Sequence, residues 1–335
     1  MKVKKYILLL CTSLSMLCNG QQQDMDSLKS KSGAVEYVEM YDNYIKTRIG
    51  FSNSFNSFRI INTADKIDFT LTPNQRLRST FTVMYRFIEI DLGYTPEFIR
   101  FNKDDDSKGK TTYFNLGTRF YFRHWMQNIQ FAKTKGFYVD KADLGIPENL
   151  LFPNFQVRKI GGSTSYIFNS NFSFRSIFLQ SEWQKKSAGS FVPGISYYLT
   201  QIKNGGASKD NIIDIALGPA YYYNWVIGER FLMSGGAYAG IGYNNTHSVY
   251  NDGTPDTTID GLSWQTQLRF TLGYNTTRFY TGLTASIDTF NYSSEARTEV
   301  QDQQQFFEFY IGYRFKAPDK LNKFMDNPPI LNKNL

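Results

Sequence analysis

The sequence predicts an all-β protein, a transmembrane antiparallel β-barrel of about 12 strands, roughly 10 to 14 at the limits. Three observations favour this fold class. In the segment 303–315, QQQFFEFYIGYRF, apolar side chains take every second position from Phe307 to Phe315, and polar or small ones lie between them. Aromatic residues make up 17% of the chain. Short and long polar joins alternate towards the C-terminus, as the turns and loops of outer-membrane barrels do.

The chain begins with a stretch typical of a secretory signal. Three lysines precede an apolar segment, 6–17, and the small residues that follow it fit a signal-peptidase site. We therefore expect residues 1–20 to be a signal peptide that is cleaved after Gly20. Lipidation of Cys18 is the alternative, for which the preceding Leu17 is large.

The composition of the remaining chain excludes several classes of protein. Both cysteines lie in the leader, so the secreted chain needs no disulfide. Cleavage removes three of the 37 Lys and Arg and none of the 30 Asp and Glu, which leaves a net charge of +4. That charge is too small and too evenly spread to indicate nucleic-acid binding. No run of ~18 apolar residues follows the leader, so we expect no transmembrane helix.

Polarity divides the rest of the chain into three parts. Residues 21–43 are polar without a strand pattern, and we expect a periplasmic lead-in there. Residues 44–315 carry the alternating pattern and form the predicted barrel. Residues 316–335 contain two prolines in tandem and do not alternate, which predicts a periplasmic tail of little regular structure.

Alternating segments follow one another through the barrel region. We expect strands at residues 45–51, 67–71, 80–94, 113–123, 128–139, 157–168, 172–183, 213–223, 231–242, 264–274, 279–288 and 307–315. Within 80–94 the phase changes between Phe87 and Ile88, which indicates either a turn between two strands or a bulge in one. The long joins 244–261 and 291–302 are expected outside the cell, with both termini in the periplasm. Counting strands back from Phe315, with the C-terminus in the periplasm, places the long connection 140–154 in the periplasm as well. Long connections are expected outside the cell, so this result indicates a miscounted strand in the first half.

Three stretches carry a family resemblance. They are the run 168–191, FNSNFSFRSIFLQSEWQKKSAGSF, with its Asn171-Phe172-Ser173 and its Gln184-Lys185-Lys186-Ser187-Ala188-Gly189-Ser190, then Leu71-Thr72-Pro73-Asn74, and the closing Gly312-Tyr313-Arg314-Phe315. Together they resemble an uncharacterised Bacteroidota outer-membrane β-barrel family, the domain of unknown function 4421. The resemblance covers nearly the whole secreted chain and implies an outer-membrane β-barrel. The family brings no activity with it. The tail after Phe315 departs from barrels whose last strand ends the chain.

The polar face of the predicted strands supplies the first candidate site. Its charged members are Arg119, Arg123, Arg269, Asp288, Glu308 and Arg314. These residues either line a pore or bind a polar solute, or they pair with one another across a filled lumen, where a buried charge needs a partner.

A second candidate lies in the segment that carries the family resemblance. Lys185, Lys186, Ser187 and Ser190 could contact a phosphate or a lipid headgroup through charge and exposed backbone N–H groups. The spacing of a nucleotide-binding loop is absent. The ordinary alternative is a flexible basic turn.

Signals for catalysis and for metals are weak. His124 could act with a serine at the membrane rim as a lipid hydrolase, although an interfacial place in an aromatic girdle is the commoner role for such a residue. With two histidines and no cysteine left, we expect no metal and no cofactor. The acidic run 104–106 lacks the spacing of a calcium-binding loop and is expected to be solvated.

For function, we expect a non-enzymatic outer-membrane barrel that interacts with a solute or lipid, or that forms a narrow channel. The alternatives are an outer-membrane lipid-modifying hydrolase and a closed structural or assembly-partner barrel. The expected partners are outer-membrane lipid and the outer-membrane assembly machinery, without nucleic acid.

Overall fold

The computed structural model describes residues 37–63, 66–85, 88–96, 98–99, 102–122, 124–178, 182–295 and 298–326. The strands are β1 (Val38–Met40), β2 (Tyr44–Asn62), β3 (Ile67–Thr72), β4 (Arg78–Tyr85), β5 (Ile88–Tyr94), β6 (Thr112–Phe122), β7 (Trp125–Val139), β8 (Leu150–Tyr166), β9 (Glu182–Gln184), β10 (Ala188–Phe191), β11 (Gly194–Asn204), β12 (Ser208–Gly218), β13 (Ala220–Ile227), β14 (Phe231–Tyr250), β15 (Thr257–Asn275), β16 (Phe279–Glu295) and β17 (Thr298–Lys316). The helices are α2 (Asp105–Lys108), α3 (Lys141–Leu144), α4 (Arg175–Phe178) and α5 (Asp319–Asp326). In this part of the chain no helix is long and apolar enough to span a membrane. The expected signal peptide, 1–20, lies outside it.

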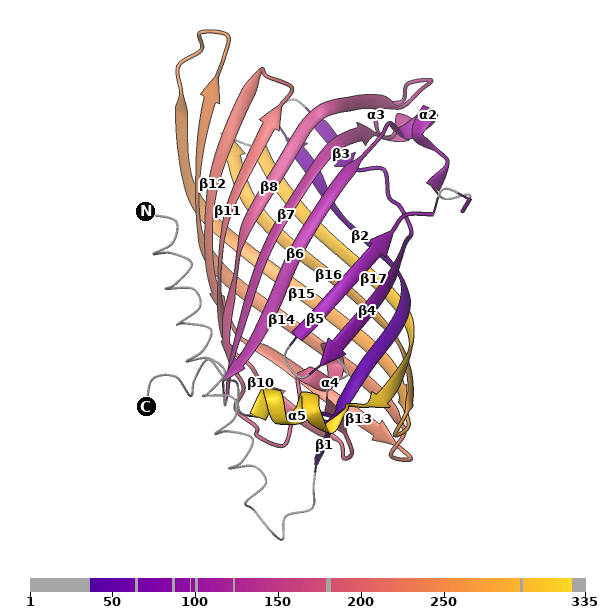
Figure 1. Ribbon diagram of the computed structural model, residues 1–335. Coiled ribbons are helices and arrows are strands. Elements are labelled where there is room, and N and C mark those ends of the chain that lie inside the picture. The colour runs from indigo at the N-terminus through magenta and orange to yellow at the C-terminus, as the bar shows by residue number, and fades with distance from the viewer. Residues whose placement is uncertain are drawn as a thin grey trace, which may run out of the picture.

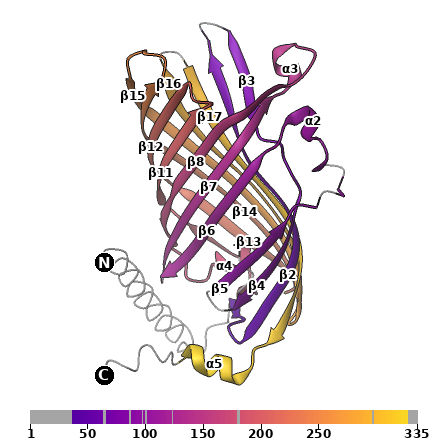
Figure 2. The ribbon, with the colours of Figure 1, turned by 45° about the horizontal axis from the view of Figure 1, so that its top comes forward.

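Antiparallel ladders close these strands into a barrel (Figures 1 and 2). Among the described residues the hydrogen-bonded ring has ten members: β2, β3, β7, β8, β11, β12, β14, β15, β16 and β17. The predicted antiparallel β-barrel is confirmed. The expected number of about 12 strands is not confirmed, because in the described part of the chain the ring closes through β3 and β7 and leaves β4, β5 and β6 outside it.

The ring is completed by a narrow contact. β3 pairs with β7 at two positions, Leu71 with Val139 and Thr72 with Tyr138. Below this contact, β4 pairs with β2 and β5 pairs with β4, while β6 pairs with β7 on the other side. Between β2 and β7 the wall therefore has two parts, β4 with β5 on one side and β6 on the other, and the contact of β3 with β7 joins them at the end of the barrel that holds α3.

The distribution of apolar and polar side chains in the wall is the reverse of that in a soluble domain. On β17 the apolar residues Phe307, Phe309, Ile311, Tyr313 and Phe315 are between 38% and 53% exposed. Glu308, Tyr310, Gly312 and Arg314, which alternate with them, are buried. Because side chains alternate across a strand, one face of this sequence meets the surroundings and the other fills the lumen.

The structure corrects several details of the expected order. Residues 172–183 do not form a strand; they lead through α4 into β9 inside the lower end of the barrel (Figures 1 and 2). The phase change in 80–94 falls between two paired strands and not within one, since Tyr85 pairs with Ile88 across β4 and β5. The strand count places the connection 140–154 at the same end of the barrel as the tail, whereas 140–149 lies at the end opposite α5 (Figure 1). The miscount came from 172–183, which the alternation predicted to be a strand of the wall.

The tail is more regular than expected. Asp319–Asp326 forms the helix α5 directly after β17. Its Asn322 side chain accepts a hydrogen bond from the Tyr85 hydroxyl at 2.7 Å. This contact fixes α5 below β4.

Inward-facing glycines make room for tyrosines on neighbouring strands. Four cross-strand pairs have this form: Gly161 with Tyr198, Gly236 with Tyr222, Gly282 with Tyr310, and Gly312 with Tyr280. A β-carbon on Gly312 would lie 2.1 Å from the Cζ atom of Tyr280, and one on Gly236 would lie 1.9 Å from the Tyr222 ring. Covering a glycine with an aromatic ring compensates for its missing side chain in a sheet.

Gly312→Ala should therefore destabilise the barrel, because the new methyl group meets the middle of the Tyr280 ring. Overpacking of this kind costs ~1–3 kcal/mol. Urea unfolding of the refolded protein, followed by tryptophan fluorescence, measures the change. Gly235→Ala is the matched control, since its β-carbon would have no neighbour closer than 3.9 Å; equal midpoints for the two variants would contradict the packing argument.

Candidate functional site: the barrel lumen

Apolar side chains fill part of the lumen at the end of the barrel that holds α3. The cluster comprises Phe58, Leu71, Phe137, Val139, Phe155, Val157, Ile202, Ile212 and Val300, all of them buried. They come from seven neighbouring strands of the ring, β12, β11, β8, β7, β3, β2 and β17, and no member of the cluster lies on β14, β15 or β16. Such a cluster excludes water from this end of the lumen.

A buried ion pair lies just below the apolar cluster. The Lys159 ammonium on β8 lies 2.7 Å from Asp302 on β17, and both side chains are almost fully buried. Lys159 also lies over the rings of Tyr198, at 4.7 Å, and Phe290, at 3.6 Å. Asn56 donates to the second oxygen of Asp302 at 2.7 Å. The carboxylate and the ammonium are thus both compensated, as buried charges must be.

A second polar group lies on the side formed by β13, β15 and β16. The Gln267 amide donates to Asp288 and accepts from the Tyr222 hydroxyl, the latter at 2.7 Å. Arg269 and Arg119 lie close enough to Asp288 to interact with its charge. This group joins strands that are distant in sequence across the lumen.

Near the end of the barrel that holds α5, arginine guanidinium groups lie over tyrosine rings. Arg48 donates to Thr82 at 3.2 Å, lies 3.7 Å from Glu308 and lies over the Tyr310 ring. Arg314 donates to the carbonyl of Thr276 at 2.8 Å.

The guanidinium of Arg314 also lies between two rings, 3.8 Å from Tyr41 and 4.4 Å from Tyr280. Burial raises the pKa of Tyr41, which precedes β2, and the Arg314 charge opposes that rise. Cation–π contacts of this kind are strongest where water is excluded.

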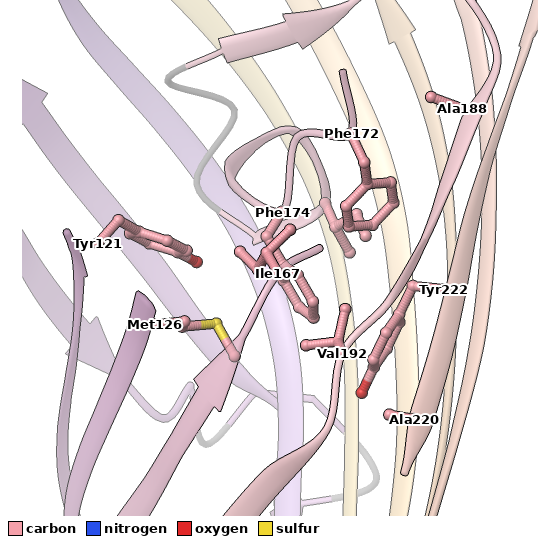
Figure 3. Close-up of a cluster of buried hydrophobic side chains, with 10 residues drawn as sticks. Tyr121, Met126, Ile167, Phe172, Phe174, Ala188, Val192, Ala220 and Tyr222 are labelled. Atoms are coloured by element: carbon pink, nitrogen blue, oxygen red, sulfur yellow. The ribbon is translucent and has the colours of Figure 1, made fainter. Parts of the chain in front are cut away.

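The chain between β8 and β10 lies inside the lower end of the barrel (Figures 1 and 2); we call its described residues, 167–178 and 182–187, the plug. Its apolar residues Ile167, Phe172, Phe174 and Ile177 pack against Tyr121, Met126, Val192, Ala220 and Tyr222 of the surrounding chain (Figure 3). The rings of Phe174 and Tyr222 are 4.6 Å apart.

Polar contacts hold the plug in place. Ser173 accepts from Asn224 of β13 through its carbonyl oxygen at 3.1 Å. Its hydroxyl donates to Glu182 at 2.6 Å, and Glu182 pairs with Arg175 at 3.1 Å. β9, at the end of the plug, pairs with β1. The plug is therefore joined both to the wall and to the segment that precedes the barrel.

The predicted lumen residues lie on the inner face where the structure describes them. Arg269, Asp288 and Arg119 share one group, whereas Glu308 and Arg314 take part in two others. Arg123 lies outside the described residues. The inner face therefore holds separate clusters and not one continuous row of charges.

The residues considered for phosphate contact are engaged within the chain. Lys185 lies 3.8 Å from Glu39, and its backbone N–H donates to Tyr37. Ser187 accepts from the backbone N–H of Val226 at 2.9 Å. Lys186 lies over the Tyr37 ring at 5.9 Å, and Ser190 donates to the carbonyl of Phe191 at 2.9 Å. In this arrangement the segment anchors the plug.

His124 anchors the start of the plug. Its Nδ1 lies 2.7 Å from the carbonyl oxygen of Ile167, and its ring stacks on Tyr166 at 5.5 Å. Trp125 meets the same Tyr166 edge-on. These contacts place the imidazole in a cluster of aromatic rings.

The acidic run 104–106 is involved in local pairing. Asp104 pairs with Lys108 at 2.6 Å. Asp105 accepts from Arg76 and from Asn74, the latter at 3.0 Å. In the described chain, no group of three or more acidic, histidine or cysteine side chains is arranged to hold a metal ion.

Sequence reasoning missed the central ion pair and the plug. Alternation places Val157 and Lys159 on the same face of β8, so the inward direction of Lys159 could have been found. Its partner Asp302 is 143 residues away. In the plug, the alternation of Phe172 and Phe174 predicted a strand, although these residues lie in the irregular segment just before the short helix α4.

Removing one partner of the central pair should be far more harmful than removing both. Lys159→Met leaves the Asp302 carboxylate buried without its cation, at a cost of ~3–5 kcal/mol. Lys159→Met combined with Asp302→Leu should recover much of that loss. Urea unfolding midpoints of the single and double variants test this; additive losses would contradict a direct interaction.

Solved structures of other barrels resemble the fold at low identity. The outer membrane protease OmpT from Escherichia coli is 7% identical, with 83% of this chain and 98% of that chain covered and a TM-score of 0.40. The translocator domain of the autotransporter NalP from Neisseria meningitidis is 6% identical, with 91% and 98% covered and a TM-score of 0.33. Ail, the attachment invasion locus protein of Yersinia pestis, is 9% identical, with 81% and 99% covered and a TM-score of 0.25.

Sequence comparison gives a sharper result. No curated protein matches the chain. The family described as Domain of unknown function (DUF4421) matches residues 25–315. This match confirms the resemblance found in the sequence. It covers the described strands from β1 to the last residue but one of β17. The chain belongs to the DUF4421 family.

Proposed function

We propose that this chain is an outer-membrane barrel with a closed lumen, non-enzymatic, that interacts with lipid or an apolar solute through its wall. A signal peptide at 1–20 delivers it, and both termini lie in the periplasm. The single observation that carries this proposal is the inverted wall, apolar outside and filled inside. A closed lumen favours this reading over a narrow diffusion channel.

Membrane insertion is supported by the outer face. Exposed aliphatic and aromatic residues form a continuous band across the strands, as at Ile213, Ile215 and Leu217 of β12 or Leu268, Phe270 and Leu272 of β15. In lipid, a closed barrel satisfies its backbone hydrogen bonds between strands. An outward apolar band is stable there because it contacts acyl chains and not water. In water the same band would be a large exposed apolar surface.

The orientation is supported by the connections. Short joins, 228–230 and 276–278, lie at the end that holds the plug and α5, while the longer 140–149 and 251–256 lie at the other end (Figure 1). Outer-membrane barrels have short periplasmic turns and longer external loops. The plug and α5 then face the periplasm.

The purified, folded barrel should give no conductance steps in a planar bilayer, because an apolar cluster closes one end and the plug closes the other. Phe174→Ala combined with Ile177→Ala should loosen the plug and raise the frequency of brief openings. Ile213→Ala combined with Ile215→Ala, on the lipid-facing side, is the matched control. Stable steps from the unmodified protein would show an open channel and overturn the closed lumen.

A second candidate function is lateral access to the lumen. β5 and β6 face each other without a ladder in the described chain. On the outside they carry Leu92, Tyr94, Phe114 and Leu116, which are between 55% and 66% exposed. The inner face of β6 is exposed as well, at Asn115 and Gly117. We count β4, β5 and β6 as passes of the wall and the short β3 as an extension beyond it, which gives a total of twelve strands. The junction of β5 and β6 is then a seam through which a lipid or apolar solute reaches the lumen.

Single cysteines test whether this seam is open. The chain from Gln21 onward has no cysteine, so one label reports one position. Asn115→Cys in the folded barrel should react rapidly with a water-soluble maleimide. Thr271→Cys, also inward-facing but 0% exposed, should react after unfolding. Equal protection of the two thiols would mean that the seam is sealed.

A further inference from the structure

Five cations gather on the outer face of the barrel, above the apolar band on β7, β8, β11 and β12. They are Lys133, Lys135, Arg158, Lys203 and Lys209, and we call them the basic patch. On each of the four strands an outward apolar residue lies just below: Phe131, Ile160, Leu199 and Ile213. The patch thus begins where the apolar band ends, at the end of the barrel with the longer connections.

The strand register brings these cations together. Lys133 lies directly opposite Arg158, and Lys203 lies directly opposite Lys209. Lys135 and Lys203 flank the same residue, Gln156, from its two sides. Like charges directly opposite one another destabilise a sheet. An arrangement with two such pairs calls for an anion between them.

The chain does not supply that anion. β7, β8 and β11 contain no acidic residue. The acids of β12, Asp210 and Asp214, share the parity of the buried, inward-facing Ile212. Within the described residues none of the five cations has an ion-pair partner, so the positive charge of the patch is uncompensated.

Another outward-facing cation shows the contrast. Arg59 on β2 forms two hydrogen bonds with Asp68 on β3, at 2.8 Å and 2.6 Å. Its charge is therefore neutralised within the sheet. The basic patch differs because its counter-charge has to come from outside the chain.

We infer that the basic patch binds the phosphate groups of an anionic lipid in the outer leaflet, whose acyl chains lie against the apolar band below. The planar guanidinium group of Arg158 can donate two parallel hydrogen bonds to a phosphate, and the lysine ammonium groups add positive charge around it. Four strands ~4.8 Å apart span ~14 Å, a distance that fits a lipid with two separate phosphates better than one with a single phosphate. The leaflet assignment rests on the proposed membrane orientation.

The test uses the full secreted chain, folded in detergent and titrated with diphosphoryl lipid A, with the bound lipid counted by native mass spectrometry. The variant Lys133→Gln/Arg158→Gln/Lys203→Gln should bind about 100-fold more weakly, at about fivefold for each cation removed. Monophosphoryl lipid A should bind the unmodified protein more weakly than the diphosphoryl form.

Arg230→Gln/Arg278→Gln/Lys316→Gln is the matched control, since it removes the same charge from the opposite end of the barrel and should leave lipid binding unchanged. Equal affinity of the patch variant and the unmodified protein would overturn the inference. Displacement of the lipid by an equal concentration of inorganic pyrophosphate would also overturn it, by showing a site for soluble anions.

Failure of the proposed function can be told apart from failure of the patch. Binding in detergent does not depend on orientation, whereas protease cleavage in 251–256 on intact cells reports which end is outside. Cleavage there supports an outer-leaflet site. Protection of that loop, together with cleavage of 316–326, would reverse the orientation and overturn the leaflet assignment, even where lipid A still binds.

Discussion

The outward direction of the apolar face is the constraint on which the rest of this structure depends. A strand whose odd positions meet lipid must place its even positions in the lumen, whatever their polarity. On β17 this rule places Asp302, Glu308 and Arg314 inside. Charges removed from water need partners, so the outer face determines that the interior must hold a compensated set of charges and cannot be a simple apolar core.

The lumen meets this demand by being filled. Lys159 and Asp302 form an ion pair next to an apolar cluster. Tyrosine rings occupy the space beside glycines of the neighbouring strands. At the lower end the plug covers the opening and is tied to the wall by Asn224. Where its side chains pack in this way, the lumen resembles a protein interior, in which side chains interdigitate with few voids. The arrangement favours a role at the surface or the seam of the wall over flow along its axis.

The wall departs from uniformity at two places, and in the proposed membrane setting both face lipid. Between β5 and β6 the ladder is interrupted, and unpaired strand edges are costly in lipid unless something covers or hydrates them. On β7 to β12 the outer rim carries cations without acids, and anionic headgroups are what the membrane offers at that depth. The first feature suits a lipid or apolar molecule passing sideways, and the second suits an anionic lipid held in place. Both features support the proposal that this barrel acts through its contact with lipid.

The sequence by itself determined the fold class, the facing of side chains along each clear strand, and the family. Alternation is local, so the inward direction of Arg269, Asp288 and Glu308 could be predicted from a few neighbouring residues. Ring closure through β3 and β7, the pairing of Lys159 with Asp302 over 143 residues, and the conversion of 172–183 into a plug were decided by tertiary structure. Each depends on contacts between segments that are distant along the chain, and no local periodicity records which segments meet.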